Sequence, residues 1–283
     1  MKQEHIELRV PGQVAGAASM NVWILNNISV DQGKRRPVIL ICPGGAYSRC
    51  SDREGEPVAM QFLAMGYHVA VLEYSVAPDH FPTSLLELAE AAARIRERAE
   101  EWHVDPERLM VCGFSAGGHL ACSLGAMWNR KFVFQALGRG AEELKPNGMI
   151  LGYPVITSGK SAHRDSFTNL LGEAAEDENM LELVSLEKQV GSQTPPAFIW
   201  HTYADQSVPV ENSLLLAMAL RKAKVKTELH IYPDGIHGLS LANEETAGAR
   251  QDCIEPSCQS WITLVKTWLE TQFPSEKLDV PTE

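Results

Sequence analysis

Apolar residues along the chain form two alternating patterns, which are short continuous runs and longer stretches with helical spacing. Continuous apolar runs bounded by turn residues are typical of buried strands in a parallel sheet. They predict strands over residues 36–42, 68–74, 108–112, 147–153 and 197–203, and the strand-like run Thr-Glu-Leu-His-Ile-Tyr predicts a sixth over 227–232. The stretches between them predict helices, among them 57–65, 83–103, 210–222 and 258–271. Strands that alternate with helices indicate an α/β chain whose parallel sheet is covered on both faces.

Two early runs, 5–10 and 21–26, predict an antiparallel pair of strands at the start of the chain.

Two predicted helices each carry an apolar face that we interpret as core packing. The predicted helix 83–103 places seven apolar side chains on one face, namely Leu85, Leu88, Ala89, Ala92, Ile95, Ala99 and Trp102. A stripe at helical spacing predicts a face that packs on a core. The last predicted helix has a similar face, which we interpret as packing on the sheet, with part of it a candidate dimer contact; this face carries Trp261, Leu264, Val265 and Trp268.

One turn carries candidate chemistry. Residues 113–118 read Gly-Phe-Ser-Ala-Gly-Gly, between a predicted strand and a helical run. Gly-x-Ser-x-Gly in a strand–turn–helix context indicates a serine nucleophile held out at the end of a sheet. Glycine is expected at 113 and 117 because a side chain would clash across so tight a turn. The following helix start offers unpaired N–H groups and a positive dipole end, which suit a developing oxyanion. Ser115 is therefore the candidate nucleophile.

A nucleophilic serine on such a turn needs an acid and then a histidine, in that chain order. Asp205 follows the fifth predicted strand, and His237 follows the sixth. We predict that His237 takes the Ser115 proton and that Asp205 orients the imidazole. Asp234 is a rival acid, but it lies three residues before His237 in a Pro-Asp-Gly turn, where Asp is common for turn chemistry.

Three further histidines have simpler interpretations. His201 lies within a predicted strand and is interpreted as a packed core histidine. His119 follows the nucleophile turn and is expected to pack within its helix. His163 lies in a loop and is interpreted as a surface histidine, with contact to substrate as the alternative.

The loop after the strand 36–42 is the expected second half of an oxyanion hole. It reads Pro-Gly-Gly-Ala-Tyr, and its glycines let the backbone approach an oxyanion closely and turn N–H groups inward. A plain Gly-Gly turn is the alternative. The candidate donors are Gly44, Gly45 and Ala46, among which the sequence does not choose, together with Ala116. Tyr47 is a candidate wall of the substrate pocket.

With these residues the chain resembles α/β-hydrolases of the esterase/lipase type, above all acetylxylan-esterase-like and hormone-sensitive-lipase-like carboxylesterases. The resemblance runs from about residue 20 to about 270 and rests on residues 43–47, 73–78, 81–82, 113–119 and the Asp205 and His237 loops. Relatives often have His-Gly-Gly-Gly where this chain has Pro43 first and Ala46 fourth, which leaves the oxyanion donors open.

The resemblance implies a mostly parallel eight-stranded sheet with helices on both faces. It also implies hydrolysis of short acyl esters through an acyl-enzyme, with acetyl esters of sugars or xylo-oligosaccharides favoured and with no metal or cofactor. In this topology residues 155–196, which are polar and acidic in part, form an insertion over the active site. We predict a single domain over 1–283 with this lid-like insertion, and a surface loop without substrate contact is the alternative.

Composition narrows the partners and the location. A length of 283 residues suits one domain, and 45% hydrophobic residues suffice for a full core. The net charge of −11 disfavours nucleic acid and anionic membranes as partners. The charged start, Met1-Lys-Gln-Glu-His-Ile-Glu, lacks the apolar segment of a signal peptide, and no apolar run approaches a membrane span. A cytoplasmic location is therefore expected.

The cysteines and the remaining alternatives complete the prediction. The six cysteines have no metal-like spacing; a reducing cytosol favours free thiols, although Cys253 and Cys258 could pair. An arylformamidase would use the same machinery on N-formyl groups. A prolyl-oligopeptidase-like peptidase would need an added domain for which this chain has no room. A non-catalytic hydrolase-fold protein typically lacks a member of the triad, whereas all three are present here.

Overall fold

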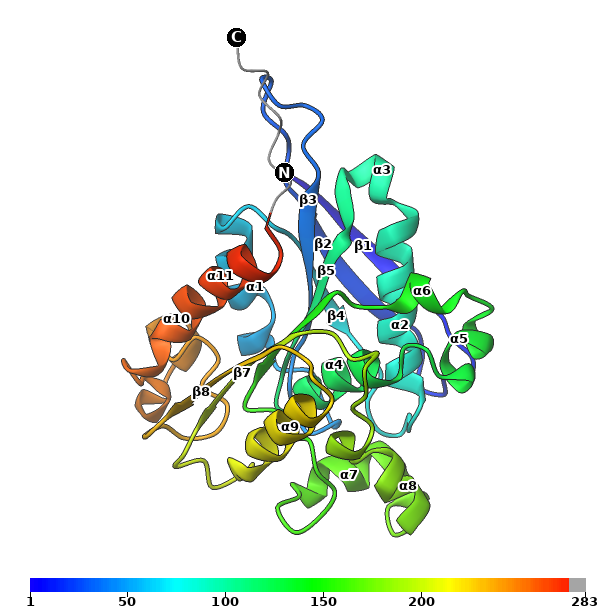
Figure 1. Ribbon diagram of the computed structural model, residues 1–283, viewed down its shortest axis with the longest axis vertical. Coiled ribbons are helices and arrows are strands. Elements are labelled where there is room, and N and C mark those ends of the chain that lie inside the picture. Colours follow the sequence, from blue (N-terminus) through cyan, green and yellow to red (C-terminus); the bar gives the residue numbers. More distant parts are fainter. Residues whose placement is uncertain (275–283) are drawn as a thin grey trace.

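The centre of the molecule is one eight-stranded sheet with the order β1-β2-β4-β3-β5-β6-β7-β8 (Figure 1). The structure is a computed structural model and describes residues 1–274. The strands are β1 Lys2–Leu8, β2 Ala18–Ile24, β3 Arg36–Cys42, β4 His68–Glu73, β5 Val104–Phe114, β6 Gly148–Gly152, β7 Ala197–Thr202 and β8 Thr227–Tyr232. Strand β2 is antiparallel to β1 and β4, and every other neighbouring pair is parallel. The predicted mostly parallel eight-stranded sheet is confirmed.

Helices cover both faces of this sheet. The α-helices are α1 Glu56–Ala64, α2 Thr83–Glu97, α3 Ala99–Trp102, α4 Ala116–Met127, α5 Lys131–Leu137, α6 Ala141–Leu144, α7 Arg164–Leu171, α8 Glu178–Leu183, α9 Glu211–Lys222, α10 Glu244–Ala247 and α11 Trp261–Gln272. Short 3-10 turns are η1 Asp52–Glu54, η2 Gly172–Ala174, η3 Leu186–Lys188, η4 Gln251–Cys253 and η5 Cys258–Ser260. Helices α1 and α11 lie on one face, and α2 and α4 lie on the other (Figure 1).

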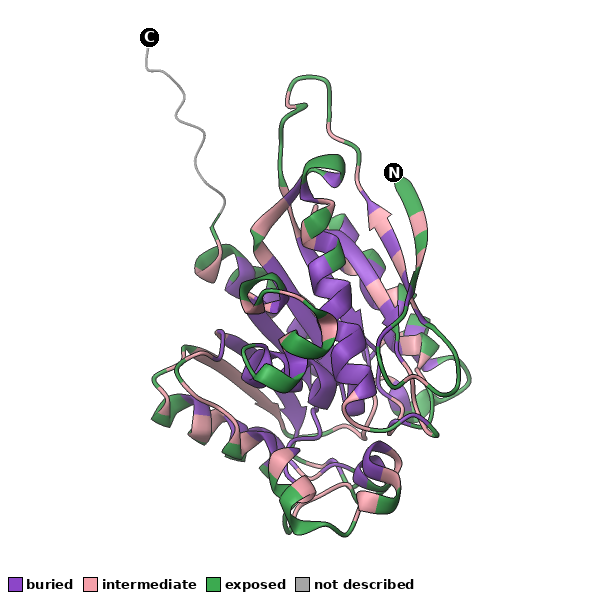
Figure 2. Cartoon of the chain, turned by 90° about the vertical axis from the view of Figure 1, so that its right-hand side faces the viewer, coloured by how far each residue is buried: buried purple, intermediate pink, exposed green. Residues whose placement is uncertain are grey.

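Two hydrophobic cores lie between the sheet and these helices. Successive side chains of a strand point to opposite faces, so Ile39 and Ile41 of β3 pack with α1 and α11, whereas Val38 and Leu40 pack with α2 and α4. Burial is concentrated in the central strands and the helix faces against them (Figure 2). This two-sided burial explains why the central parallel strands have largely continuous apolar sequences, whereas the edge strand β8 does not.

Helix α4 approaches the sheet most closely, and every one of its residues is buried. Its sequence is rich in glycine and alanine, which leaves room for that approach. A Cβ at Gly125 would lie 2.2 Å from the Met149 sulfur of β6. The absence of a side chain at this position lets the last turn of α4 lie directly against β6.

The predicted helix 83–103 is divided in the structure. Helix α2 ends at Glu97, α3 follows, and His103 has a left-handed φ of 53°. Arg98 and Trp102 both contact Glu4 of β1, with nitrogen–oxygen distances of 2.7 Å and 3.2 Å. These contacts bind the end of the segment to the edge strand, and the left-handed residue then turns the chain into β5.

Other element ends differ more modestly. Strands β1 and β2 pair from Lys2 opposite Ile24 to Leu8 opposite Ala18, so both begin three residues earlier than predicted. The last helix starts as a 3-10 turn and becomes α-helical at Trp261. Each of the six cysteines lies in the described residues and is a free thiol.

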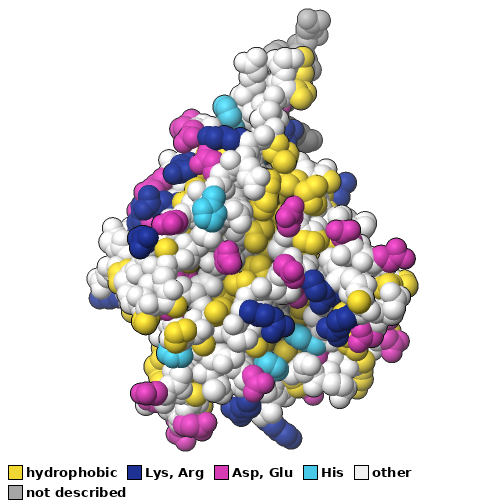
Figure 3. Space-filling view, turned by 180° about the vertical axis from the view of Figure 1, so that it is seen from behind, with side chains coloured by type: hydrophobic (Ala, Val, Ile, Leu, Met, Phe, Trp, Pro, Cys, Tyr) yellow, Lys and Arg dark blue, Asp and Glu magenta, His cyan; other side chains and the backbone are white. Residues whose placement is uncertain are grey.

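The outer surface carries charges of both signs. Acidic and basic side chains are interspersed over the face in Figure 3. None of the helices within residues 1–274 is both long enough and apolar enough to cross a membrane.

Helix α11 gives a direct test of the packing. Trp268 is 2% exposed and its ring contacts Phe198 and Phe273, with ring centroids 5.9 Å and 5.4 Å apart. We expect Trp268→Ala to lower the free energy of unfolding by about 3–5 kcal/mol, because it removes buried area and leaves a cavity. Lys266→Ala on the outer face of the same helix should change it by less than about 0.5 kcal/mol. Denaturant unfolding followed by circular dichroism measures both, and equal effects would contradict the packing.

Candidate active site

Loops at the carboxyl edge of the sheet bring together the three residues of the predicted triad. His237 Nε2 lies 2.8 Å from Ser115 Oγ, and His237 Nδ1 lies 2.6 Å from Asp205 Oδ2. A carboxylate only accepts hydrogen bonds, so Nδ1 carries the proton and Nε2 is free to accept from the serine O–H. This is the orientation in which a histidine can act as general base toward a serine.

The serine stands on a strained turn. Ser115 has φ 54° and ψ −120°, between the end of β5 and the start of α4. Non-glycine residues rarely adopt this conformation, and it costs on the order of 1–3 kcal/mol. A Cβ at Gly113 would lie 2.0 Å from the Gly117 oxygen, and one at Gly117 would lie 2.1 Å from the Cys42 oxygen. Both glycines of the motif are therefore required by close backbone approach.

Asp205 is buried and hydrogen-bonded on both oxygens. Oδ1 accepts the N–H groups of Ser207 and Val208, each at 2.9 Å, and Oδ2 accepts from His237. Burial by itself raises the pKa of Asp205, but the hydrogen bonds from His201, His237 and Val208 together hold that pKa well below its usual range. The group is therefore a carboxylate at neutral pH.

His201 is a buried core histidine, as interpreted from sequence, but it also contacts the acid. Its Nε2 lies 3.0 Å from the Val208 oxygen and 3.3 Å from Asp205 Oδ2, and Ser213 donates to its Nδ1 at 2.7 Å. Because the Val208 carbonyl oxygen can only accept a hydrogen bond, Nε2 of His201 carries the proton. This second contact of Asp205 was missed at the sequence level; the position of His201 four residues before Asp205 was the available signal.

The rival acid is placed differently. Asp234 is exposed, whereas Asp205 occupies the Nδ1 side of His237. The structure thus brings together Ser115, His237 and Asp205, and it leaves Asp234 at the surface of its turn.

The candidate oxyanion loop has one of its N–H groups already engaged. Gly44 donates to Glu54 Oε2 at 2.7 Å, in a buried hydrogen bond. Gly44 is therefore not offered as an oxyanion donor, which leaves Gly45 and Ala46 in this loop together with Ala116. Gly45 and Ala46 both have positive φ, 134° and 56°, so this part of the loop turns sharply beside the nucleophile.

Tyr47 was predicted to line the substrate pocket, and its burial does not fit that role. The side chain is 2% exposed, and its hydroxyl lies 2.8 Å from His119 Nδ1. His119 Nε2 lies 2.8 Å from the Val184 oxygen. Because a carbonyl only accepts, His119 donates through Nε2 and accepts the Tyr47 O–H at Nδ1. Tyr47 is buried because hydrogen bonds through His119 connect it to Val184 of the segment 155–196.

The segment 155–196 contains α7, η2, α8 and η3 and contacts the candidate site at several points. Asn169 donates to the Ala46 oxygen at 2.8 Å, and Asn212 of α9 accepts the N–H groups of Ile156 and Thr157. His163 is partly buried and bonded to Ser166. Burial lowers the pKa of His163.

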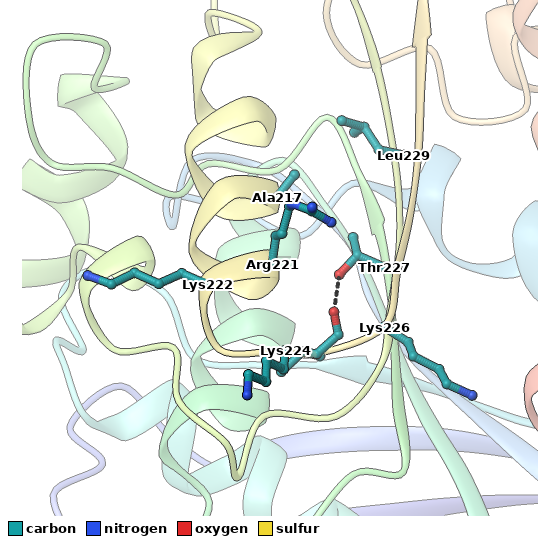
Figure 4. Close-up of a pocket in the computed structure, with 8 residues that line it drawn as sticks. Ala217, Arg221, Lys222, Lys224, Lys226, Thr227 and Leu229 are labelled. Atoms are coloured by element: carbon teal, nitrogen blue, oxygen red, sulfur yellow. Dashed lines mark hydrogen bonds between the residues drawn. The ribbon is translucent and has the colours of Figure 1, made fainter.

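One surface hollow lies away from these residues. It has a volume of about 810 Å³ and lies between the end of α9 and the start of β8, at the amino end of that strand. Its lining includes four basic residues, Arg221, Lys222, Lys224 and Lys226. Their side chains extend in different directions rather than toward one point (Figure 4). The arrangement does not converge on a ligand, and we assign it none.

Comparisons with known proteins agree on a family. The BD-FAE family profile matches residues 27–220. The chain is 41% identical over 221 residues to endo-1,4-beta-xylanase B of Butyrivibrio fibrisolvens, covering 75% of this chain and 34% of that protein. It is 31% identical over 204 residues to acetylxylan esterase of Xylanibacter ruminicola, covering 70% of this chain and 40% of that protein. The chain thus spans only about a third to two fifths of the length of these relatives.

Solved structures are similar over nearly the whole chain. The acetyl ester-xyloside bifunctional hydrolase of Caldicellulosiruptor lactoaceticus is 36% identical with a TM-score of 0.78, covering 92% of this chain and 89% of that one. The carboxylesterase Cest-2923 of Lactobacillus plantarum is 29% identical with a TM-score of 0.83, covering 96% and 98%. These likenesses confirm the α/β-hydrolase fold and the resemblance to carboxylesterases.

The buried His119 predicts a pH dependence of stability. Burial lowers its pKa from 6.5 to about 4, so between these values the unfolded chain binds a proton that the folded chain does not. The contribution of neutral His119 to the free energy of unfolding is complete above about pH 6.5. This contribution falls by about 3 kcal/mol as the pH drops toward 4. We expect His119→Gln to lose that part of the slope when unfolding is measured from pH 4 to 7.

A second histidine provides an independent case. Burial likewise lowers the pKa of His68 to about 4, and His68→Gln should remove a similar share of the slope. Identical pH profiles for wild type and both variants would contradict the assignment of neutral, buried histidines.

Proposed function

Because the chain belongs to the BD-FAE family, we propose that it is a serine carboxylesterase that hydrolyses short-chain acyl esters through an acyl-enzyme. The observation that carries this proposal is the hydrogen-bonded series Ser115–His237–Asp205 at the carboxyl edge of the sheet. The similarity of the chain to an acetylxylan esterase and to an acetyl ester-xyloside bifunctional hydrolase favours acetyl esters of sugars or xylo-oligosaccharides as the substrate class.

Acylation begins with attack of Ser115 Oγ on the ester carbonyl while His237 Nε2 takes the proton. The Asp205 carboxylate stabilises the imidazolium that forms. The carbonyl oxygen becomes an oxyanion, and we assign its stabilisation to the N–H of Ala116 and to an N–H of Gly45 or Ala46. Such preorganised donors act most strongly in a site that excludes water. His237 then gives its proton to the departing alcohol.

Deacylation uses the same groups with water as the nucleophile. His237 Nε2 takes a proton from the water, which attacks the acetyl carbonyl, and the proton is returned to Ser115 Oγ as acetate leaves. In each half of the cycle His237 passes on the proton that it has taken, first to the alcohol and then to Ser115 Oγ, so ester and water are the only reactants.

We further propose one hydrolase domain in which residues 155–196 form a lid over the site. Supporting this, Asn169 donates to the Ala46 oxygen of the oxyanion loop, and the Val184 oxygen accepts from His119, which accepts in turn from Tyr47. In this proposal the lid shapes the pocket for the alcohol or acyl group. The cytoplasmic location and the homodimer stay predictions.

The function is tested by acetate release from an acetylated xylo-oligosaccharide, measured beside p-nitrophenyl acetate and p-nitrophenyl butyrate. We expect rapid release from the sugar, and Ser115→Ala to lower turnover by about 10⁴ to 10⁶, by comparison with triad substitutions in other enzymes. Ser123→Ala is the matched control, since Ser123 is a buried serine of α4, the helix that follows Ser115, and it donates to the His119 oxygen.

The remaining outcomes separate the alternatives. Turnover in Ser115→Ala close to that of wild type would refute the mechanism. Activity on aryl esters alone would keep the esterase and reject the sugar. Faster cleavage of N-formylkynurenine or of a proline p-nitroanilide peptide would replace the esterase with an arylformamidase or a peptidase.

A further inference from the structure

We propose that Glu54 is a positioning residue of this site, whose buried carboxylate holds the oxyanion loop and the His237 loop in place around Ser115. The inference rests on the proposed function, because positioning has meaning only for a reactive serine. Glu54 is the last residue of η1 and is 4% exposed. It lies outside the triad, and none of the sequence motifs includes it.

The carboxylate joins two loops directly. Oε2 accepts the Gly44 N–H at 2.7 Å, and Oε1 accepts the Tyr153 O–H at 2.6 Å. Gly44 belongs to the oxyanion loop after β3, and Tyr153 follows β6 directly. Hydrogen bonds to an ionised acceptor are short and about twice as strong as neutral ones, and both distances are in that range.

On the side of the oxyanion loop, the carboxylate lies beside the nucleophile. A Cβ at Gly44 would lie 2.7 Å from Glu54 Oε2 and 3.0 Å from Ser115 Cβ. The loop backbone is therefore confined between the carboxylate and the serine, with no room for a side chain. With the Gly44 N–H held by Glu54, the path of the chain through Gly45 and Ala46 is fixed relative to Ser115.

On the histidine side, the connection passes through Tyr153. Its hydroxyl accepts the Ser240 N–H at 2.8 Å, and its ring meets the His237 ring edge-on with centroids 5.1 Å apart. Burial first and the charge of Glu54 next raise the pKa of Tyr153, so its hydroxyl stays protonated and keeps donating. Ser240 also donates to the backbone oxygen of Arg53 at 2.6 Å, which binds the His237 loop to η1 a second time.

The energetic cost of this arrangement favours a role beyond packing. A buried carboxylate is destabilising unless hydrogen bonds compensate its lost hydration. Here the compensating donors are the backbone of one catalytic loop and the tyrosine that packs on the proposed base. Their positions matter most in the transition state, where donors and base must be aligned within a fraction of an ångström. Loss of Glu54 should therefore lower kcat more than it changes KM.

The experiment compares Glu54→Ala, Glu54→Gln and Tyr153→Phe with wild type. The readouts are kcat and KM on p-nitrophenyl acetate and the rate at which a fluorophosphonate probe labels Ser115. We expect Glu54→Ala to lower kcat by about 100-fold with KM changed by less than about 3-fold, a loss comparable to that of an oxyanion donor. The labelling rate should fall in parallel.

The conservative variants separate positioning from stability. Glu54→Gln can keep an oxygen toward Gly44 but presents an amide to Tyr153, so we expect a loss of about 10-fold. Tyr153→Phe keeps the ring on His237 and removes the hydroxyl, and it should also lower kcat. Glu56→Gln, an exposed acid two residues further on, is the matched control and should leave kcat unchanged.

The outcomes distinguish this proposal from the proposed function. A kcat and a labelling rate within about twofold of wild type in Glu54→Gln and Tyr153→Phe would overturn it, even where Glu54→Ala fails to fold. If wild type hydrolyses no ester but Ser115 is labelled, and Glu54→Gln slows that labelling, the esterase assignment fails and the positioning role stands. Absence of labelling in wild type would overturn both.

Discussion

The site depends on how closely the start of α4 approaches strands β3 and β5. At Gly117 an added Cβ would lie 2.1 Å from the backbone oxygen of Cys42, at the end of β3. This contact leaves the chain too little space for an ordinary strand-to-helix connection, and Ser115 takes a positive φ as a result. Neighbouring backbone bonds maintain the strain, since Ser115 donates to the Gly152 oxygen and accepts the Val155 N–H, both at 3.0 Å. The strained serine is thus held by β6 as well as by its own strand and helix.

The close packing of α4 on the sheet does not fix the loops around Ser115. Buried carboxylates fix these loops through hydrogen bonds. Asp205 accepts two backbone N–H groups of its own loop, so its carboxylate is oriented before it meets His237. Glu54 accepts from Gly44 in the loop after β3 and from Tyr153 after β6, and thereby connects those two segments. In both cases the carboxylate accepts from groups on separate segments, and each donor it satisfies offsets part of the cost of burying the charge. A charge buried in this way specifies one arrangement, because any displaced loop would leave it without a partner.

The parts of this arrangement that depend on local pattern were predictable. The strands 36–42 and 227–232 match β3 and β8 in full, because each run ends sharply at a proline, Pro43 and Pro233. Ser115, Asp205 and His237 meet because the carboxyl ends of parallel strands share an edge, so chain order was sufficient to associate them. The burial of Glu54 was not predictable from sequence, since the charged segment Asp-Arg-Glu at 52–54 is typical of an exposed turn. Glu54 is buried because the connection from β3 to α1 carries it beneath the neighbouring loops. The burial of Tyr47 likewise depends on Val184, more than a hundred residues away in sequence.

The segment 155–196 is hydrogen-bonded to three separate parts of the molecule around the candidate site. Its first residues bind Asn212 on α9, its helix α7 binds Ala46, and Val184 near its end accepts from His119 on α4. His119 is neutral because burial lowers its pKa to about 4, and it can therefore donate to Val184 and accept from Tyr47 at the same time. The oxyanion loop is consequently held by Glu54 on one side and, through Tyr47 and Asn169, by the segment 155–196 on the other. If residues 155–196 form the proposed lid, a change in that segment would alter the proposed pocket and would also displace the backbone that follows Gly44, so the fit of the substrate and the geometry of the candidate oxyanion loop would change together.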